Sequence, residues 1–127
     1  ALLVLDTHVA VWWAGDPGRL GRNARARLET EDRLGIPSIV FWEVALLVRR
    51  RKLDLGMPVA DWADTILSVP RVEPLPLTAE VALQADALQM HPDPPDRFIV
   101  ATALRNGVPL VSKDRLLRTL RFVVTVW

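Results

Sequence analysis

The chain has 127 residues, a length that fits one domain able to bury about two-thirds of the surface it exposes when unfolded. Its 16 basic and 15 acidic residues nearly cancel, so net charge alone indicates no class of partner. The absence of cysteine excludes disulfides and thiolate metal sites, and no apolar run approaches the roughly 20 residues of a membrane span. No secretory leader pattern is visible. We therefore predict a single domain over residues 1–127, no membrane association and a cytoplasmic location.

Short apolar runs alternate with segments of helical period along the chain. The opening run from Leu2 to Leu5 is continuously apolar, which predicts a strand covered on both faces, as in a parallel sheet. In chain order we predict strand 2–5, helices 7–13 and 21–31, strand 34–37, helices 38–52 and 58–67, extended segment 72–77, helices 78–88 and 93–106, strand 110–112, helix 115–120 and strand 122–127. This alternation predicts a layered α/β fold with a mostly parallel sheet.

Two acidic residues fall at the ends of predicted strands. Asp6 ends the first strand, and Asp114 lies just beyond the strand at residues 110–112. In open parallel sheets, ligands bind outside the carboxyl ends of the strands, near the point where the strand order reverses. The alternative is that each Asp only caps the helix that follows it. Either role leaves the carboxylate at an edge where a ligand can reach it.

Glu43 stands out because it lies within an apolar helix, which Ser38 is predicted to cap. Hardly another polar side chain occurs between Glu43 and Arg49. A charge in such a segment is costly to bury unless it is paired or bound to a cation. The alternatives are an ion pair with an arginine, for example Arg50 about two turns further on, or a place on a narrow solvated face.

The run Asp93-Pro94-Pro95-Asp96 matches the beginning of a helix, with Asp93 as the N-cap and proline at the first helical position. Capping is sufficient to explain Asp93. Asp96 falls in the first helical turn and can project outward to a ligand as well. We expect the neighbouring Arg97 to pair with Asp93, the alternative being contact with a phosphate.

Four acids from separate segments, namely Asp6, Glu43, Asp96 and Asp114, thus share unusual positions. Clustered carboxylates repel one another, so a fold that gathers them needs a compensating cation. With no cysteine and only two histidines in the chain, the ligands would all be oxygen atoms. An all-oxygen set suits Mg²⁺ or Mn²⁺ and argues against structural zinc or copper.

Four segments of the chain, in the same order and spacing, resemble the motifs of PIN domains, and specifically of the VapC-type toxin ribonucleases of bacterial and archaeal toxin–antitoxin pairs. The resemblance covers essentially the whole chain. The segments are Leu3-Val4-Leu5-Asp6-Thr7-His8, Ile39-Val40-Phe41-Trp42-Glu43-Val44-Ala45, residues 91–103 around Asp93-Pro94-Pro95-Asp96-Arg97, and Leu110-Val111-Ser112-Lys113-Asp114. What the resemblance implies is a Rossmann-like three-layer fold with four acids meeting at one end of the sheet.

The resemblance also implies roles for particular residues and partners. The four acids of the family correspond to Asp6, Glu43, Asp96 and Asp114. Asp93 matches an additional acid of the subgroup that carries this Asp-Pro-x-Asp-Arg pattern, and Thr7 and Ser112 match small hydroxyl residues that orient ligands or waters. The implied partners are an RNA substrate, an antitoxin whose C-terminal segment covers the cleft, and a second copy of the chain in a homodimer.

These observations predict metal-dependent hydrolysis of RNA phosphodiester bonds. A metal held by Asp6, Asp96 and Asp114 would activate a water and polarise the phosphoryl oxygen. Glu43 would act as a ligand, as a hydrogen-bond acceptor behind the ligands or as a base, and the sequence does not choose among these roles. Substrate-steering residues are predicted from the basic side chains Arg49, Arg50 and Lys113, the alternative being ordinary solvated charges.

Three alternatives remain open at this stage. An α/β phosphotransfer domain is one, although an Asp-nucleophile phosphatase wants a second Asp at the place of His8, and a receiver wants paired acids before its first helix. A non-catalytic binding module, with the acids serving only as helix caps, is another. A DNA nuclease is the third, because a metal site does not itself distinguish deoxyribose from ribose.

Overall fold

A single parallel sheet of five strands organises the computed structural model, which describes residues 1–127. Neighbouring strands pair in parallel throughout, in the order β3-β2-β1-β4-β5. The strands are β1 (Leu2–Leu5), β2 (Arg33–Pro37), β3 (Val72–Leu75), β4 (Leu110–Val111) and β5 (Thr125–Val126). The predicted α/β fold with a parallel central sheet is therefore confirmed.

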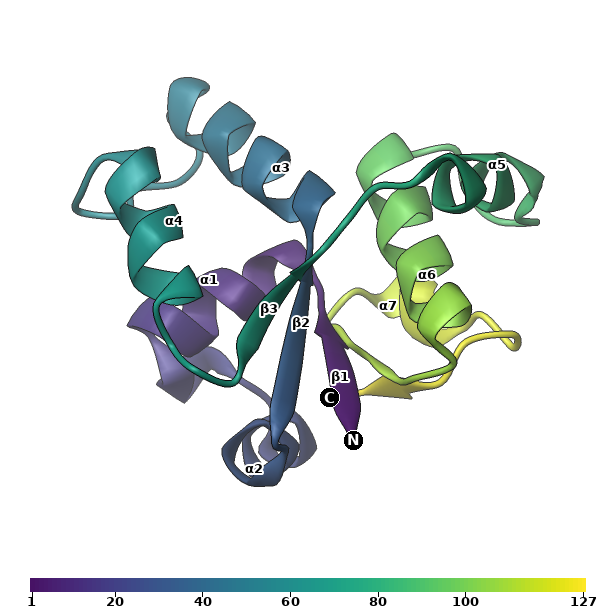
Figure 1. Ribbon diagram of the computed structural model, residues 1–127, viewed down its shortest axis with the longest axis horizontal. Helices are drawn as coiled ribbons and strands as arrows, with labels where there is room; N and C mark the ends of the chain where they lie inside the picture. Colours follow the sequence, from purple (N-terminus) through teal and green to yellow (C-terminus); the bar gives the residue numbers. More distant parts are fainter.

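Helices pack on both faces of this sheet, with α1 and α4 on one side and α6 on the other (Figure 1). The helices are α1 (Thr7–Gly15), α2 (Arg22–Thr30), α3 (Ser38–Arg49), α4 (Val59–Leu67), α5 (Ala79–Ala87), α6 (Pro94–Asn106) and α7 (Arg115–Arg118), with a short 3₁₀ turn at Pro17–Arg19. From β1 the chain adds β2 and β3 on one side of the sheet, and it then returns past β1 to add β4 and β5 on the other side. Because connections between parallel strands are right-handed, the helices of these two halves cover opposite faces of the sheet. None of the helices is long and apolar enough to cross a membrane.

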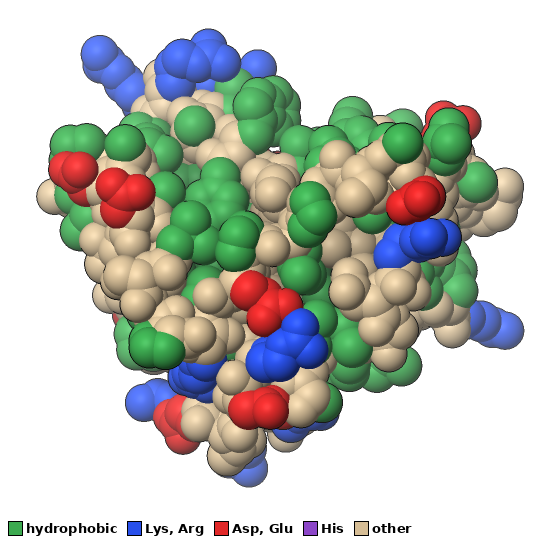
Figure 2. Space-filling view, viewed as in Figure 1, with side chains coloured by type: hydrophobic (Ala, Val, Ile, Leu, Met, Phe, Trp, Pro, Cys, Tyr) green, Lys and Arg blue, Asp and Glu red, His purple; other side chains and the backbone are tan.

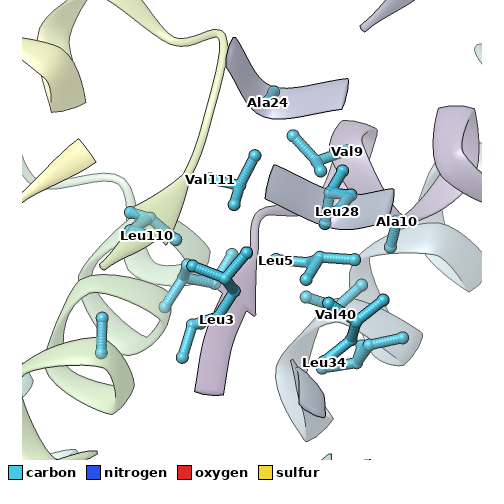
Figure 3. Close-up of a cluster of buried hydrophobic side chains, with 14 of the residues drawn as sticks. Leu3, Leu5, Val9, Ala10, Ala24, Leu28, Leu34, Val40, Leu110 and Val111 are labelled. Carbon is cyan, nitrogen blue, oxygen red and sulfur yellow. The ribbon is translucent and has the colours of Figure 1, made fainter. Parts of the chain in front are cut away.

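Strand β1 lies at the centre of the core because all four of its side chains are buried. Leu5 faces Val9 of α1 and Leu28 of α2, whereas Leu3 lies towards Leu110 of β4 (Figure 3). The continuously apolar sequence of β1 thus results from helices covering both faces of the sheet. This rigid packing fixes the position of the residue that follows the strand.

The strand order reverses at β1, which lies between β2 and β4. Val4 pairs with Leu110, so the carboxyl ends of β1 and β4 lie next to each other. This edge faces the top of the view in Figure 1, where α1 and α3 begin directly after their strands. The fold therefore places the residues that follow β1 and β4 at the point where parallel sheets bind ligands.

Three local expectations need correction. Ser38 was expected to cap α3, but it is the first helical residue, and Pro37 at the N-cap position makes no side-chain hydrogen bond. The last strand is only Thr125–Val126, because the preceding residues 119–124 form turns and bends. Helix α3 ends at Arg49, three residues earlier than predicted, because Arg51 adopts a left-handed conformation with φ of 58°.

Candidate active site

Asp6 is held at the carboxyl end of β1 by two hydrogen bonds. Its Oδ1 accepts a hydrogen bond of 2.8 Å from the backbone N–H of Thr7, and its Oδ2 accepts one of 2.6 Å from the hydroxyl of Ser112. The side chain is only 8% exposed. Burial raises the pKa of Asp6, and the two hydrogen bonds from Ser112 and Thr7 counteract part of that effect. Asp6 thus caps α1 and also faces the cleft described below, so the two expected roles are compatible.

Ser112 joins the ends of the two adjacent strands. Its hydroxyl donates to Asp6 and at the same time accepts a hydrogen bond of 3.0 Å from the backbone N–H of Asp114. Asp114 in turn caps α7, because its Oδ1 accepts hydrogen bonds of 2.8 and 3.2 Å from the N–H groups of Leu116 and Leu117. Ser112 is fully buried, so this small hydroxyl holds both acids at a fixed separation.

Glu43 is half-buried in α3, and its Oε1 accepts a hydrogen bond from the hydroxyl of Thr7. No arginine pairs with it, so the alternative of an ion pair with Arg50 is wrong. Burial raises the pKa of Glu43; the Thr7 hydroxyl lowers it, and the charges of Asp6 and Asp93 raise it further. A carboxylate that is buried this way without a cation is costly to ionise.

Asp96 lies in the first turn of α6, close to four other acids. Burial first, and then the negative charges of four neighbouring acids, raise the pKa of Asp96 to about 8; these acids are Asp6, Asp93, Asp114 and Glu43. The Nε2 atom of His91 lies 3.5 Å from Oδ2 of Asp96. Asp93 occupies the N-cap position of α6, as predicted, but its side chain makes no capping hydrogen bond.

All five acids line one cleft of about 680 Å³ at the carboxyl edge of the sheet. The remaining lining is His8, Trp12, Arg19, Lys52, Leu53, Lys113, Arg115 and Leu116. The five acids offer only carboxylate oxygen atoms as metal ligands, which suits a hard divalent cation. No three His, Asp or Glu side chains are arranged to coordinate one metal ion. Side-chain rotation would therefore be needed for several of these carboxylates to meet at one ion.

The structure places the predicted basic residues differently from the expectation. Lys113 lines the cleft, but Arg49 and Arg50 lie exposed at the end of α3 and take no part in the lining. Figure 2 shows basic side chains gathered at the top of the view, where α3 ends. Of this basic run, Lys52 reaches the cleft, because the chain turns back after α3.

Arg97 does not pair with Asp93, contrary to our expectation. Its guanidinium donates hydrogen bonds to five backbone carbonyl groups in the last turn of α5 and in the loop that follows it; the acceptors are Ala85, Asp86, Leu88, Met90 and His91, at 2.7 to 3.3 Å. These bonds fix the loop that leads into Asp93 and Asp96. Arg97 is therefore a structural residue that supports the site from behind.

Several residues of the cleft were not predicted from the sequence, namely Trp12, Arg19, Lys52 and Arg115. One signal was available for Trp12. His8 and Trp12 are four residues apart on α1 and so share a helix face, and their rings lie 5.6 Å apart between centroids. Because α1 begins next to Asp6, that face is directed toward the cleft. Arg19 gave no such signal, because it follows a turn whose path the sequence does not reveal.

Comparison with known proteins gives the family of this chain. Residues 3–123 match the PIN domain family. The chain is also 39% identical to ribonuclease VapC22 of Mycobacterium tuberculosis over 129 residues, covering 98% of each protein. The chain belongs to the VapC family of PIN domains. The resemblance noted from the sequence is confirmed.

Solved structures of other VapC proteins share the fold of this PIN domain. The structure of VapBC2 from Rickettsia felis, bound to a DNA fragment from its promoter, aligns with a TM-score of 0.72 at 18% identity, covering 98% of this chain and 97% of the other. VapC20 of Mycobacterium tuberculosis, described as a toxin that cleaves the sarcin–ricin loop, aligns with a TM-score of 0.61 at 20% identity, covering 89% and 90%. At these identities the likeness establishes the fold alone.

Proposed function

We propose that this PIN domain is the ribonuclease toxin of a toxin–antitoxin module and hydrolyses RNA phosphodiester bonds with Mg²⁺ or Mn²⁺. One observation carries the proposal: acids from four distant segments line one cleft, where burial and the charges of the other acids raise the pKa of Asp96 to about 8. A fold gains nothing in stability from such a cluster, so function explains it better than structure does. The 39% identity to a protein named as a ribonuclease supports RNA as the substrate.

The metal would be held by Asp6, Asp96 and Asp114, with Glu43 and Asp93 completing the acidic lining. A bound divalent ion supplies positive charge beside the scissile phosphate and makes a nearby water more acidic. Its charge would also stabilise the ionised form of Asp96, which the metal-free cleft disfavours. The negative charges that repel one another in the metal-free cleft would thus attract a divalent ion.

The protein's own groups orient these acids and move the proton. Ser112 and Thr7 hold the carboxylates of Asp6 and Glu43 by hydrogen bonds, which fixes the oxygen atoms that face the cleft. The raised pKa of Glu43 brings this group closer to neutral pH, where it can accept a proton from an attacking water.

The deciding experiment is digestion of single-stranded RNA in Mn²⁺ by the wild-type protein and by Asp6→Asn. We expect the variant to lose at least about 100-fold in rate while it remains folded, because it removes a charged oxygen ligand and keeps the size of the side chain. Asp64→Asn is the matched control, since Asp64 is exposed on α4, outside the cleft. An Asp6→Asn protein as active as the control would exclude this mechanism.

The same assay separates the alternatives. A single-stranded DNA of the same sequence, digested equally well, would make the chain a nuclease without sugar preference. No digestion of either polymer, together with no Mn²⁺ binding by calorimetry, would favour a non-catalytic binding module. Labelling of Asp6 by a small phosphodonor such as acetyl phosphate would revive a phosphotransfer domain.

The proposal includes two protein partners. An antitoxin would cover the cleft with its C-terminal segment, and two copies of this chain would form a homodimer. Fold relatives described as a toxin–antitoxin complex from Klebsiella pneumoniae and as a VapBC complex from Salmonella typhimurium support the first partner. Co-expression with the product of a short open reading frame found immediately upstream would test the antitoxin, which should co-purify and inhibit digestion. Light scattering of the purified chain measures the oligomeric state.

A further inference from the structure

Four cations line the cleft, namely Arg19, Lys52, Lys113 and Arg115, and none of them forms an ion pair with an acid of the chain. Arg19 and Lys113 differ from the other two because both lie over one aromatic ring. Both side chains line the cleft that contains five carboxylates, and both are exposed. An exposed ion pair gains little free energy, so a contact with an aromatic ring can decide where such a cation lies.

That ring is the indole of Trp12. The guanidinium carbon of Arg19 lies 4.8 Å from the centre of the Trp12 ring, and Nζ of Lys113 lies 5.3 Å from it. Both distances fall within the range of a cation–π interaction. The ring itself is fixed, since Trp12 is only 8% exposed and packs 6.0 Å from the ring of Trp127.

A ring holds a cation without neutralising its charge, which is the difference between Trp12 and a carboxylate partner. An ion pair with an acid of the cleft would cancel one positive and one negative charge. On the indole, Arg19 and Lys113 keep their full charge, and the carboxylates stay free for a divalent ion. The cleft thus presents separate places for a metal ion and for an anion.

We propose that Trp12 is a positioning residue that holds Arg19 and Lys113 for contact with backbone phosphates of single-stranded RNA beside the scissile bond. The proposal rests on the proposed function, since it takes RNA as the substrate. Arg19 offers a planar fork that can contact two phosphate oxygens, and Lys113 offers a compact charge. Such contacts fix the register of the strand without reading its bases, and they partly offset the repulsion between phosphate and five carboxylates.

The test measures binding of a fluorescent 20-nucleotide RNA of mixed sequence to the non-cleaving Asp6→Asn protein, in EDTA, over a range of salt concentrations. Each phosphate contact on a single strand contributes about 0.7 to the slope of log K against log salt concentration. The double variant Arg19→Gln/Lys113→Gln should therefore have a slope shallower by about 1.4. The matched control is Arg22→Gln/Arg118→Gln, which removes the same charge from exposed residues outside the cleft.

The role of Trp12 needs its own variants. Trp12→Phe keeps an aromatic face and should retain most of the slope, whereas Trp12→Leu should lose as much as the double variant. Because Trp12→Leu removes a core side chain, a ring-fluorinated tryptophan at position 12 provides a second test. It keeps the size of the ring but weakens its attraction for cations, and it should also flatten the slope. In the active protein, the same substitutions should raise KM and leave kcat nearly unchanged.

Four outcomes would overturn the proposal. The double variant could keep the wild-type slope, or the control could lose as much as the double variant does. The fluorinated protein could bind as the wild type does, which would remove the role of Trp12. The double variant could leave RNA binding intact but weaken binding of a 20-residue polyglutamate, which would assign the cations to an acidic protein partner. Failure of the proposed function would show separately, as wild-type protein that does not digest RNA in Mn²⁺.

Discussion

Without divalent cations, raising the pH should destabilise this protein, because Asp96 holds its proton more tightly in the folded state. Its pKa rises from the ordinary 3.8 to about 8 on folding, through burial and the charges of the neighbouring acids. Between about pH 4 and pH 8 the folded chain therefore binds more protons than the unfolded chain. The free energy of unfolding must fall as the pH rises through this window.

The magnitude follows from proton linkage. One extra proton in the folded state lowers the free energy of unfolding by about 1.4 kcal/mol per pH unit, which gives about 3 kcal/mol from pH 5 to pH 7. The raised pKa values of Asp6 and Glu43 act in the same direction. Exposed partners lower the pKa values of Asp32 and Glu73. The stability that these two groups contribute is therefore lost on acidification, mainly below pH 4.5, which lies outside the range from pH 5 to pH 7.

Urea denaturation at pH 5, 6 and 7 in EDTA measures the effect. Asp96→Asn should be more stable than the wild type at pH 7, with a pH dependence smaller by about 1.4 kcal/mol per pH unit. The control Asp86→Asn, an exposed acid outside the cleft, should follow the wild type. Adding Mg²⁺ at pH 7 should restore stability to the wild type, which the metal-binding acids predict. Parallel profiles for wild type and Asp96→Asn would refute this account of the cleft.

Three further substitutions test particular contacts. Arg97→Met should destabilise the protein by about 3 kcal/mol in urea denaturation, because five backbone carbonyl groups lose their donor; a change below about 0.5 kcal/mol would contradict this. Thr7→Val removes the hydroxyl that holds Glu43 and should lower the rate of RNA digestion by about 10-fold or more at similar stability, and an unchanged rate would argue against an orienting role. Gly35→Ala should cost about 1–3 kcal/mol, since the added Cβ would lie 2.5 Å from Cδ1 of Leu75; a wild-type melting temperature would show that Leu75 moves away freely.

The order of strands and helices was predictable because it depends on local patterns. The apolar run Leu2 to Leu5 has no polar face, so it had to be covered on both sides, and the structure buries all four residues. Element ends were less predictable. Ser38 is a favourable N-cap residue, yet the helix begins at Ser38 itself with Pro37 at the N-cap position, and sequence patterns do not locate a helix end to within one residue.

The sequence also indicated which acids to consider, but not what surrounds them. Asp6 and Asp114 could be found because each follows an apolar strand, and Glu43 because it interrupts an apolar helix. The pairing of Arg97 could not be predicted, since its five acceptors are backbone carbonyl groups at the end of α5 and in the loop after it. Backbone acceptors leave no trace in the identity of the residues that carry them.

What the sequence by itself determined is the periodicity of the elements, the all-oxygen ligand chemistry and the family motifs, all of which depend on residues close in the chain. Only the tertiary structure decided which charges share the cleft. It excludes Arg49 and Arg50, and it admits Arg19, which lies over the ring of Trp12. The physical reason is that electrostatic energy depends on distance through space, and that distance is set by the packing of the whole sheet and its helices.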